Sequence, residues 1–158
     1  MNFAELHKKR LKNDYEEMCC LANSPIVSWK ATKGEVPYVE EYLLTINVRT
    51  YSGPGVIMNQ CNVRISLPMD YPKRAPKVVM EEPVVFHPNW YANGMWDYGW
   101  FQCSESLGNF VARMIRSLQY DPMQINLYSP SNNEAKRWYL DNRELLSADN
   151  QVLSNPYA

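Results

Sequence analysis

Apolar and polar residues alternate along three segments in the first half of the chain, at residues 26–31, 41–48 and 61–67. Alternation with a period of two predicts β-strands that bury one face of a sheet. A short apolar run at residues 77–80 predicts a fourth strand. Glycine-containing turn sequences at residues 33–35 and 52–55 would join successive strands into an antiparallel meander.

Residues 2–18 predict a helix before the first strand. Asn2 is its expected N-cap, and Glu5 is the expected capping-box partner. The face opposite the apolar residues carries a basic run, namely Lys8, Lys9 and Arg10. Such a run is either a solvated helix face or a docking surface for a partner.

Two more helices are predicted in the second half. Ser104 is the expected N-cap of the first, and Asp121-Pro122 would end it. Its apolar residues recur three and four positions apart: Leu107, Phe110, Val111, Met114, Ile115 and Leu118. Ser131 and Glu134 form a capping box for the last helix. The order of elements predicts an α+β fold in one domain, residues 1–158, with helices segregated from an antiparallel sheet.

The charge of the chain is nearly balanced, with 16 Lys and Arg against 17 Asp and Glu and a net charge of −1. The charges are interspersed, whereas a nucleic-acid-binding protein usually has a strongly basic patch. No apolar run approaches the roughly 18 residues of a membrane-spanning helix. We therefore expect neither a nucleic-acid partner nor a membrane partner.

The cysteines indicate a reducing, cytoplasmic setting, because their spacing suggests neither a disulfide framework nor a Cys-x-x-Cys zinc pair. They are Cys19, Cys20, Cys61 and Cys103. Cys61 is in the buried phase of its strand, so we expect a core thiol there. His87 has no cysteine or histidine at ligand spacing, and no glycine-rich phosphate loop precedes a helix. We therefore expect no metal site and no cofactor.

The segment from Phe86 to Cys103 is the candidate functional loop. It is dense in aromatic residues and contains the turn signal Asn93-Gly94. The aromatic residues either pack the loop onto the core or form an exposed platform for a partner's tail. Trp90 and Tyr98 are our candidates for exposed positions.

Three motifs and the order of elements resemble the ubiquitin-conjugating enzyme family. The first motif is a proline-rich crossing before the fourth strand, Tyr71-Pro72-x-x-Ala75-Pro76. The second, Phe86-His87-Pro88-Asn89, resembles the His-Pro-Asn signature of the family. The third, Asn93-Gly94, lies where the family turns towards its active-site residue. The segment from Ser129 to Ala135, with Trp138 and Asn142, is similar to bacterial members. The resemblance extends over roughly residues 3–146 and implies the fold of that family.

The chemistry that the resemblance implies is acyl transfer, in which a cysteine carries a ubiquitin-like protein as a thioester. His87 takes the structural position of the family, and Asn89 takes the position of the donor to the developing oxyanion. The nucleophile is expected ten residues after His87, and that position holds Asp97. A carboxylate could form only a mixed anhydride, which hydrolyses readily, so Asp97 is a poor substitute for a thiol.

Four interpretations follow from this departure. The protein is a variant without transferase activity that keeps the fold to bind a ubiquitin-like protein or an active partner. Alternatively Cys103, six residues beyond Asp97, is the nucleophile, because a helix start lowers the pKa of a thiol. A third interpretation is that the natural chain has cysteine at position 97. The fourth is an unrelated interaction module on the same scaffold. Asp97 itself is either a solvated loop carboxylate or an anion that mimics or repels a thioester intermediate.

The first interpretation is our working hypothesis. The tail of a ubiquitin-like or conjugated partner would lie along a groove formed by Asn89, Trp90, Asp97 and Tyr98. The basic run of the first helix would be the docking surface for an activating enzyme. Bacterial proteins of this family commonly work beside an activating enzyme or in antiviral operons, so the resemblance implies such a setting.

Overall fold

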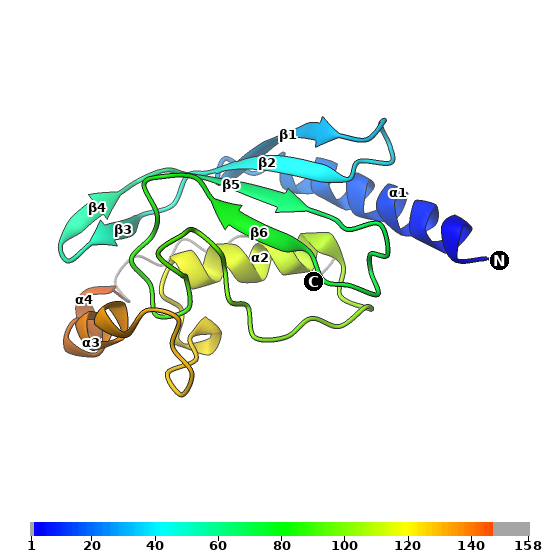
Figure 1. Cartoon of the computed structure of the whole chain (residues 1–158). Helices are drawn as coiled ribbons and strands as arrows, with labels where there is room; N and C mark the ends of the chain where they lie inside the picture. Colours follow the sequence, from blue (N-terminus) through cyan, green and yellow to red (C-terminus); the bar gives the residue numbers. More distant parts are fainter. Residues whose placement is uncertain (1, 147–158) are drawn as a thin grey trace.

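The computed structural model describes residues 2–146 and has an α+β fold, with a helix before a four-stranded antiparallel sheet and further helices after it (Figure 1). The helices are α1 (Phe3–Leu21), α2 (Leu107–Leu118), the 3-10 turn η1 (Pro122–Gln124), α3 (Asn133–Asp141) and α4 (Arg143–Leu146). The strands are β1 (Val27–Lys33), β2 (Glu41–Ile46), β3 (Thr50–Gly53), β4 (Val56–Met58), β5 (Cys61–Ser66) and β6 (Lys77–Met80).

The four predicted strands are confirmed as β1, β2, β5 and β6, which lie side by side in that order and are all antiparallel. The register aligns the buried phase of each strand across the sheet. One such row contains Trp29, Leu44, Val63 and Met80. Three of these side chains are fully buried and Trp29 packs against the core. The alternation in the sequence therefore becomes one continuous apolar face.

Cys61 is part of this face, where it pairs with Ile46 of β2. Its side chain is buried, and burial raises the pKa of the Cys61 thiol to about 12. A thiol with that pKa stays protonated at neutral pH and is unreactive. The prediction of a core thiol is confirmed.

The strands β3 and β4 form a separate hairpin that the sequence did not predict. The predicted turn at residues 52–55 is its tip, and Tyr51 in β3 packs against Tyr120 and Trp138. Strands of three and four residues are too short for an alternation to stand out from their surroundings. The hairpin lies at one end of the molecule, close to α3 (Figure 1).

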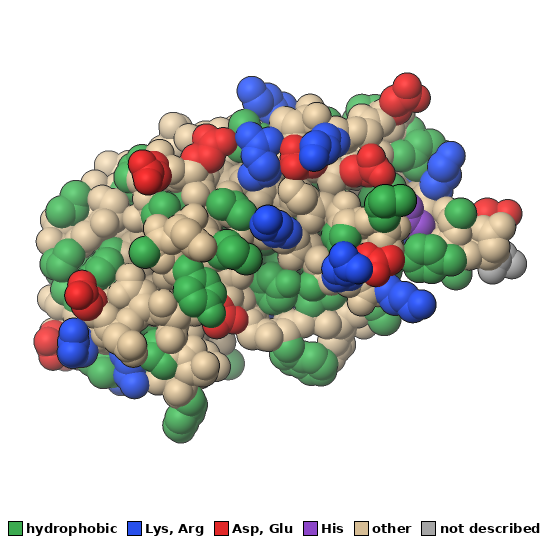
Figure 2. Space-filling view, in the orientation of Figure 1, with side chains coloured by type: hydrophobic (Ala, Val, Ile, Leu, Met, Phe, Trp, Pro, Cys, Tyr) green, Lys and Arg blue, Asp and Glu red, His purple; other side chains and the backbone are tan. Residues whose placement is uncertain are grey.

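The helix α1 begins as predicted, since Asn2 Oδ1 accepts a hydrogen bond from the Glu5 N–H at 2.9 Å. It continues three residues beyond the predicted end, to Leu21. None of the helices in residues 2–146 is long and apolar enough to cross a membrane. Acidic and basic side chains are mixed over the visible face of the molecule (Figure 2).

The helix α2 lies beneath the sheet and buries all six apolar residues that predicted it (Figure 1). Its N-cap is Ser106, whose Oγ accepts from the Asn109 N–H at 3.2 Å, so the prediction of Ser104 was wrong. Carboxylates of α1 determine this start. Asp14 Oδ1 accepts from the Leu107 N–H at 3.1 Å, and Glu17 Oε1 accepts from the Ser106 hydroxyl at 2.6 Å. Both carboxylates stabilise the partial positive charge at the helix N-terminus.

The N-cap of α3 is Asn132, whose Oδ1 accepts from the Ala135 N–H at 3.0 Å. The prediction of Ser131 was therefore wrong by one residue. Asparagine and serine are comparable N-caps, so local preference does not separate them. Ser131 instead bonds to a side chain of the functional loop.

Candidate functional site

The functional loop folds back on itself between Asn89 and Asp97. The Asp97 N–H donates to the Asn89 carbonyl at 2.9 Å, and the Tyr91 N–H donates to the Met95 carbonyl at 2.9 Å. The predicted turn Asn93-Gly94 closes this small hairpin. Asn89 and Asp97, eight positions apart in the sequence, are thus neighbours at the open end of the hairpin.

The hairpin is fixed to the sheet by the edge strand β6. The Met80 N–H donates to the Gly94 carbonyl at 2.8 Å, and the Trp96 N–H donates to the Val78 carbonyl at 3.2 Å. Gly94 has φ +96°, and an added Cβ would lie 2.3 Å from the Met80 carbonyl oxygen. Only glycine fits this approach, so the turn residue also determines how closely the loop docks on the sheet.

His87 is fully buried and shapes the entry to the hairpin. Its Nδ1 accepts from the Asn89 N–H at 2.9 Å, and its ring stacks on Tyr120 with centroids 5.2 Å apart. Because Nδ1 is an acceptor, the ring is neutral and its proton is on Nε2. Burial lowers the pKa of His87 to about 3, although the backbone of Ser117 opposes part of this effect. A buried, neutral ring at this position acts by supporting the loop.

The amide of Asn89 holds a second loop against the hairpin. Its Oδ1 accepts from the Asn126 N–H at 2.8 Å, and its Nδ2 donates to the Asn126 carbonyl at 2.9 Å. Both ends of the side chain are thus bonded to the backbone of one residue. One Nδ2 hydrogen remains for any donation to a ligand.

Asp97 is half-buried at the open end of the hairpin. Its Oδ2 accepts from the Ser131 hydroxyl at 2.9 Å, and its Oδ1 accepts from the Gly99 N–H at 3.2 Å. No cation lies within 4.0 Å of the carboxylate in residues 2–146, so its partners are neutral. Burial raises the pKa of the neighbouring Tyr98 phenol, and the charge of Asp97 adds to this effect.

Asn89 and Asp97 line the same groove, which has a volume of about 290 Å³. Its other walls come from the residues on either side of Asp97, from α2, and from η1 and the two residues after it. These residues are Trp96, Tyr98, Gly99, Trp100, Arg113, Met123, Gln124, Ile125 and Asn126. Trp100 and Met123 expose 70% and 86% of their surface, so apolar side chains flank the groove.

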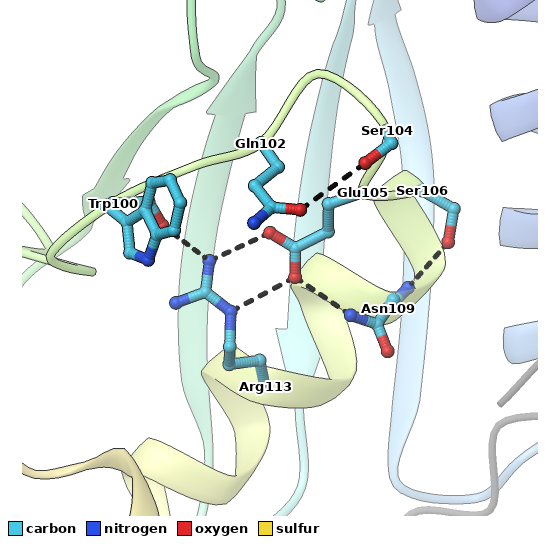
Figure 3. A pocket seen from close by; sticks show the side chains of 7 residues that line it. All are labelled: Trp100, Gln102, Ser104, Glu105, Ser106, Asn109 and Arg113. Atoms are coloured by element: carbon cyan, nitrogen blue, oxygen red, sulfur yellow. Dashed lines mark hydrogen bonds and ion pairs between the residues drawn. The ribbon is translucent and has the colours of Figure 1, made fainter.

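Two further hollows adjoin the groove. One, of about 500 Å³, lies over the start of α2 and shares Trp100 and Arg113 with the groove (Figure 3). The other, of about 410 Å³, lies on the far side of Asp97 and includes Arg74 and Lys77. Asp97 therefore lines two of the three hollows.

The structure brings together three of the four residues proposed for the groove, and the fourth prediction was wrong. Trp90 is fully buried, stacks on Trp96 at 5.8 Å and donates from Nε1 to the Ser117 hydroxyl at 3.1 Å. It therefore supports the loop from within. Tyr98 is half-buried and lines the groove, while its hydroxyl donates to the Pro76 carbonyl at 3.0 Å.

Cys103 is exposed but lines none of the three hollows. Its carbonyl accepts from Arg10, which also donates to the Glu105 carbonyl and to the Asp14 carboxylate, the latter at 2.9 Å. The loop at Cys103 is thus attached to α1, and α2 begins four residues later. Arg10 is engaged within the molecule, whereas Lys8 and Lys9 remain exposed.

Sequence reasoning missed Arg113, Asn126 and Ser131 as parts of the site. Each is joined to the functional loop by a contact over 15 or more positions of sequence. The only local signal was at Arg113, a charged residue within the apolar pattern of α2. Over residues 2–146, no group of three His, Cys, Asp or Glu side chains could hold a metal ion. Compared with family models and with curated proteins, the sequence matches none.

Proposed function

We propose that this chain is a ubiquitin-conjugating-like protein of bacterial type. In this proposal it holds the extended C-terminal tail of a ubiquitin-like or conjugated partner in the groove beside Asn89 and Asp97. It is a binding variant that lacks the nucleophile of that family. The order of helix, antiparallel meander, loop and helices supports the assignment of the fold. The position of the Asn93-Gly94 turn between Asn89 and Asp97 supports the assignment of the site.

One observation carries the proposal: Asn89 and Asp97 meet at the open end of one hairpin and line one groove. The groove is lined by the Asn89 amide, which has one Nδ2 hydrogen left for a ligand, and by the Asp97 carboxylate, and it is flanked by the exposed side chains of Trp100 and Met123. An extended peptide requires these features, namely polar groups for its main chain and apolar area for its side chains. Covering an exposed tryptophan also provides a favourable contribution to binding.

The chemistry of the groove favours binding over transfer. No cysteine lines it. In this proposal, Asp97 stands where the resemblance to the family leads us to expect the thiol. An acyl group transferred to Asp97 would form an anhydride, which water cleaves. The negative charge of Asp97 also disfavours a free terminal carboxylate beside it. We therefore infer that the preferred ligand has a neutral C-terminus, as in a conjugated tail.

The wider setting is part of the same proposal. The exposed Lys8 and Lys9 on α1 would form the docking surface for an activating enzyme. Arg10 would not take part, because its side chain is bonded to Asp14. A cytoplasmic location and a role in a bacterial antiviral operon follow from the family resemblance.

The test is a selection from short random-sequence peptides that are attached by their N-termini and amidated at their C-termini. We expect enriched peptides to shift the backbone NMR signals of residues 97–99 and 124–126. The same peptide with a free carboxylate should bind about fivefold more weakly, which corresponds to roughly 1 kcal/mol of charge repulsion at a surface. Asp97→Asn should remove this difference. A selection without enrichment, or shifts confined to other surfaces, would refute the proposed function.

A further inference from the structure

Arg113 of α2 lines the groove and contacts residues 98–100, which form one of its walls. Its Nη1 donates to the Tyr98 carbonyl at 3.0 Å, and its Nη2 donates to the Trp100 carbonyl at 3.3 Å. The two carbonyls belong to the residues on either side of Gly99. One side chain from a rigid helix thus holds both ends of this short wall.

Glu105 fixes the guanidinium in this position. Its Oε2 accepts from Nε at 3.1 Å and its Oε1 accepts from Nη2 at 2.9 Å, which makes a bidentate pair (Figure 3). The side chains of Arg113 and Glu105 are only 19% and 13% exposed, so solvent competes little with these bonds. The guanidinium carbon also lies 5.4 Å from the ring centres of Trp96 and Phe110.

The wall needs such external support. Gly99 has φ +82°, and nothing lies within 4 Å of where its Cβ would be. Residues 99 and 100 are exposed, and the Trp100 indole is 70% exposed. Within the wall, the backbone bond is from the Trp100 N–H to the Tyr98 carbonyl at 3.1 Å. Apart from Arg113, the segment is held by the Tyr98 hydroxyl, which donates to the Pro76 carbonyl, and by the Gly99 N–H, which donates to Asp97. We expect its exposed part, residues 99 and 100, to sample several conformations if Arg113 were removed.

We propose that Arg113 is the positioning residue of the groove: held by Glu105, it fixes residues 98–100 and thereby sets the width of the groove. The part of this proposal that concerns a bound peptide rests on the proposed function, whereas the part that concerns the order of residues 98–100 does not. Lysine cannot replace Arg113 here, because a point charge lacks the fork of donors that reaches two carbonyls and a carboxylate together. Preorganisation of the wall lowers the ordering cost of binding.

The test compares Arg113→Ala and Arg113→Lys with Arg116→Ala, a matched change one turn further along α2. Hydrogen exchange of the free protein measures the order of the wall without any ligand. We expect exchange of the Gly99 and Trp100 amides, which donate to Asp97 and to the Tyr98 carbonyl, to accelerate about tenfold in both Arg113 variants and to stay unchanged in Arg116→Ala. The affinity for the peptide selected above should fall about tenfold in parallel.

Arg113→Lys keeps the positive charge and the ion pair with Glu105 but loses the second donor group. It therefore separates the positioning of residues 98–100 from a general effect of charge. Slow exchange of the Gly99 and Trp100 amides in this variant would overturn the proposal, since the pair alone would then hold the wall. Faster exchange with unchanged affinity would also overturn it, because the wall would not determine binding. If the wild type binds no peptide, the proposed function fails, and the exchange data alone decide whether Arg113 orders the wall.

Discussion

The carboxylate of Asp97 accepts a hydrogen bond from the Ser131 hydroxyl at 2.9 Å, which joins the functional loop to the start of α3. The backbone of Ser131 also contacts this loop, since its N–H donates to the Pro88 carbonyl at 2.7 Å. A residue that the sequence presents as a helix cap is thus part of the site. The side chain of Asp97 is thus part of the contact between the functional loop and the residues that precede α3.

The first prediction concerns this bond. Ser131→Ala should lower the free energy of unfolding by about 1 kcal/mol, because a half-buried carboxylate loses a charge-assisted partner. Urea denaturation monitored by circular dichroism measures the change. Ser129→Ala, at an exposed neighbouring position, is the control and should leave stability unaltered. Equal stability of both variants and the wild type would show that the bond contributes nothing.

The second prediction concerns the amide of Asn89. Asn89→Asp should cost about 2 kcal/mol, because one carboxylate oxygen would face the Asn126 carbonyl where Nδ2 now donates. Asn93→Asp is a matched control in the same loop. The Asn93 Oδ1 accepts a hydrogen bond from the Met95 N–H at 3.0 Å, and an aspartate oxygen can accept the same bond. Thermal and urea unfolding compare the two. Unchanged stability of Asn89→Asp would show that the Asn89 amide does not hold the Asn126 segment against the loop.

The third prediction is a pH dependence of stability caused by His87. Its pKa is lowered to about 3 in the folded chain, from an ordinary value near 6.5. Below pH 6.5 the unfolded chain therefore binds a proton that the folded chain does not, and stability falls as the pH falls towards 3. Between pH 7 and pH 5 this amounts to about 2 kcal/mol.

His87→Asn supplies the comparison, because the asparagine side chain can still accept from the Asn89 N–H and does not titrate. This variant should be less stable at pH 7, since it fills less of a buried site. Its free energy of unfolding should, however, change less between pH 7 and pH 5 than that of the wild type. Equal slopes in the two proteins would assign the acid sensitivity to other groups.

The fourth prediction tests the chemistry at position 97 with a peptide thioester as acyl donor. In Asp97→Cys, the thiolate should attack the thioester carbonyl, form a new thioester with the protein and release the thiol of the donor. Mass spectrometry would detect an added acyl group that an excess of thiol removes. The wild type should form no such adduct.

Cys103→Ala provides the control for this experiment. An adduct on the wild type that disappears in Cys103→Ala would assign the nucleophile to Cys103, and our binding proposal would be wrong in that respect. An adduct on Asp97→Cys that persists when Cys103 is also alanine would place the reactive position at the groove. Cys103 is exposed but does not line the groove, so we expect the second result.

The sequence by itself determined the four main strands, the buried face of the sheet and the helix α2. These features depend on a period of two or of about 3.6, which a single stretch of chain displays directly. It also determined the turn at Asn93-Gly94, because this pair is favourable where positive φ is required. These local features were sufficient to place Asn89 and Asp97 on one loop.

Only the tertiary structure decided which side chains complete the site. Ser106 became the cap of α2 because α1 presents Asp14 and Glu17 to that helix start. Trp90 turned inward, and Arg113 reached the Tyr98 and Trp100 carbonyls from another element. Such partners are distant in sequence, so their choice depends on packing and on the need to satisfy buried polar groups, which no local pattern encodes.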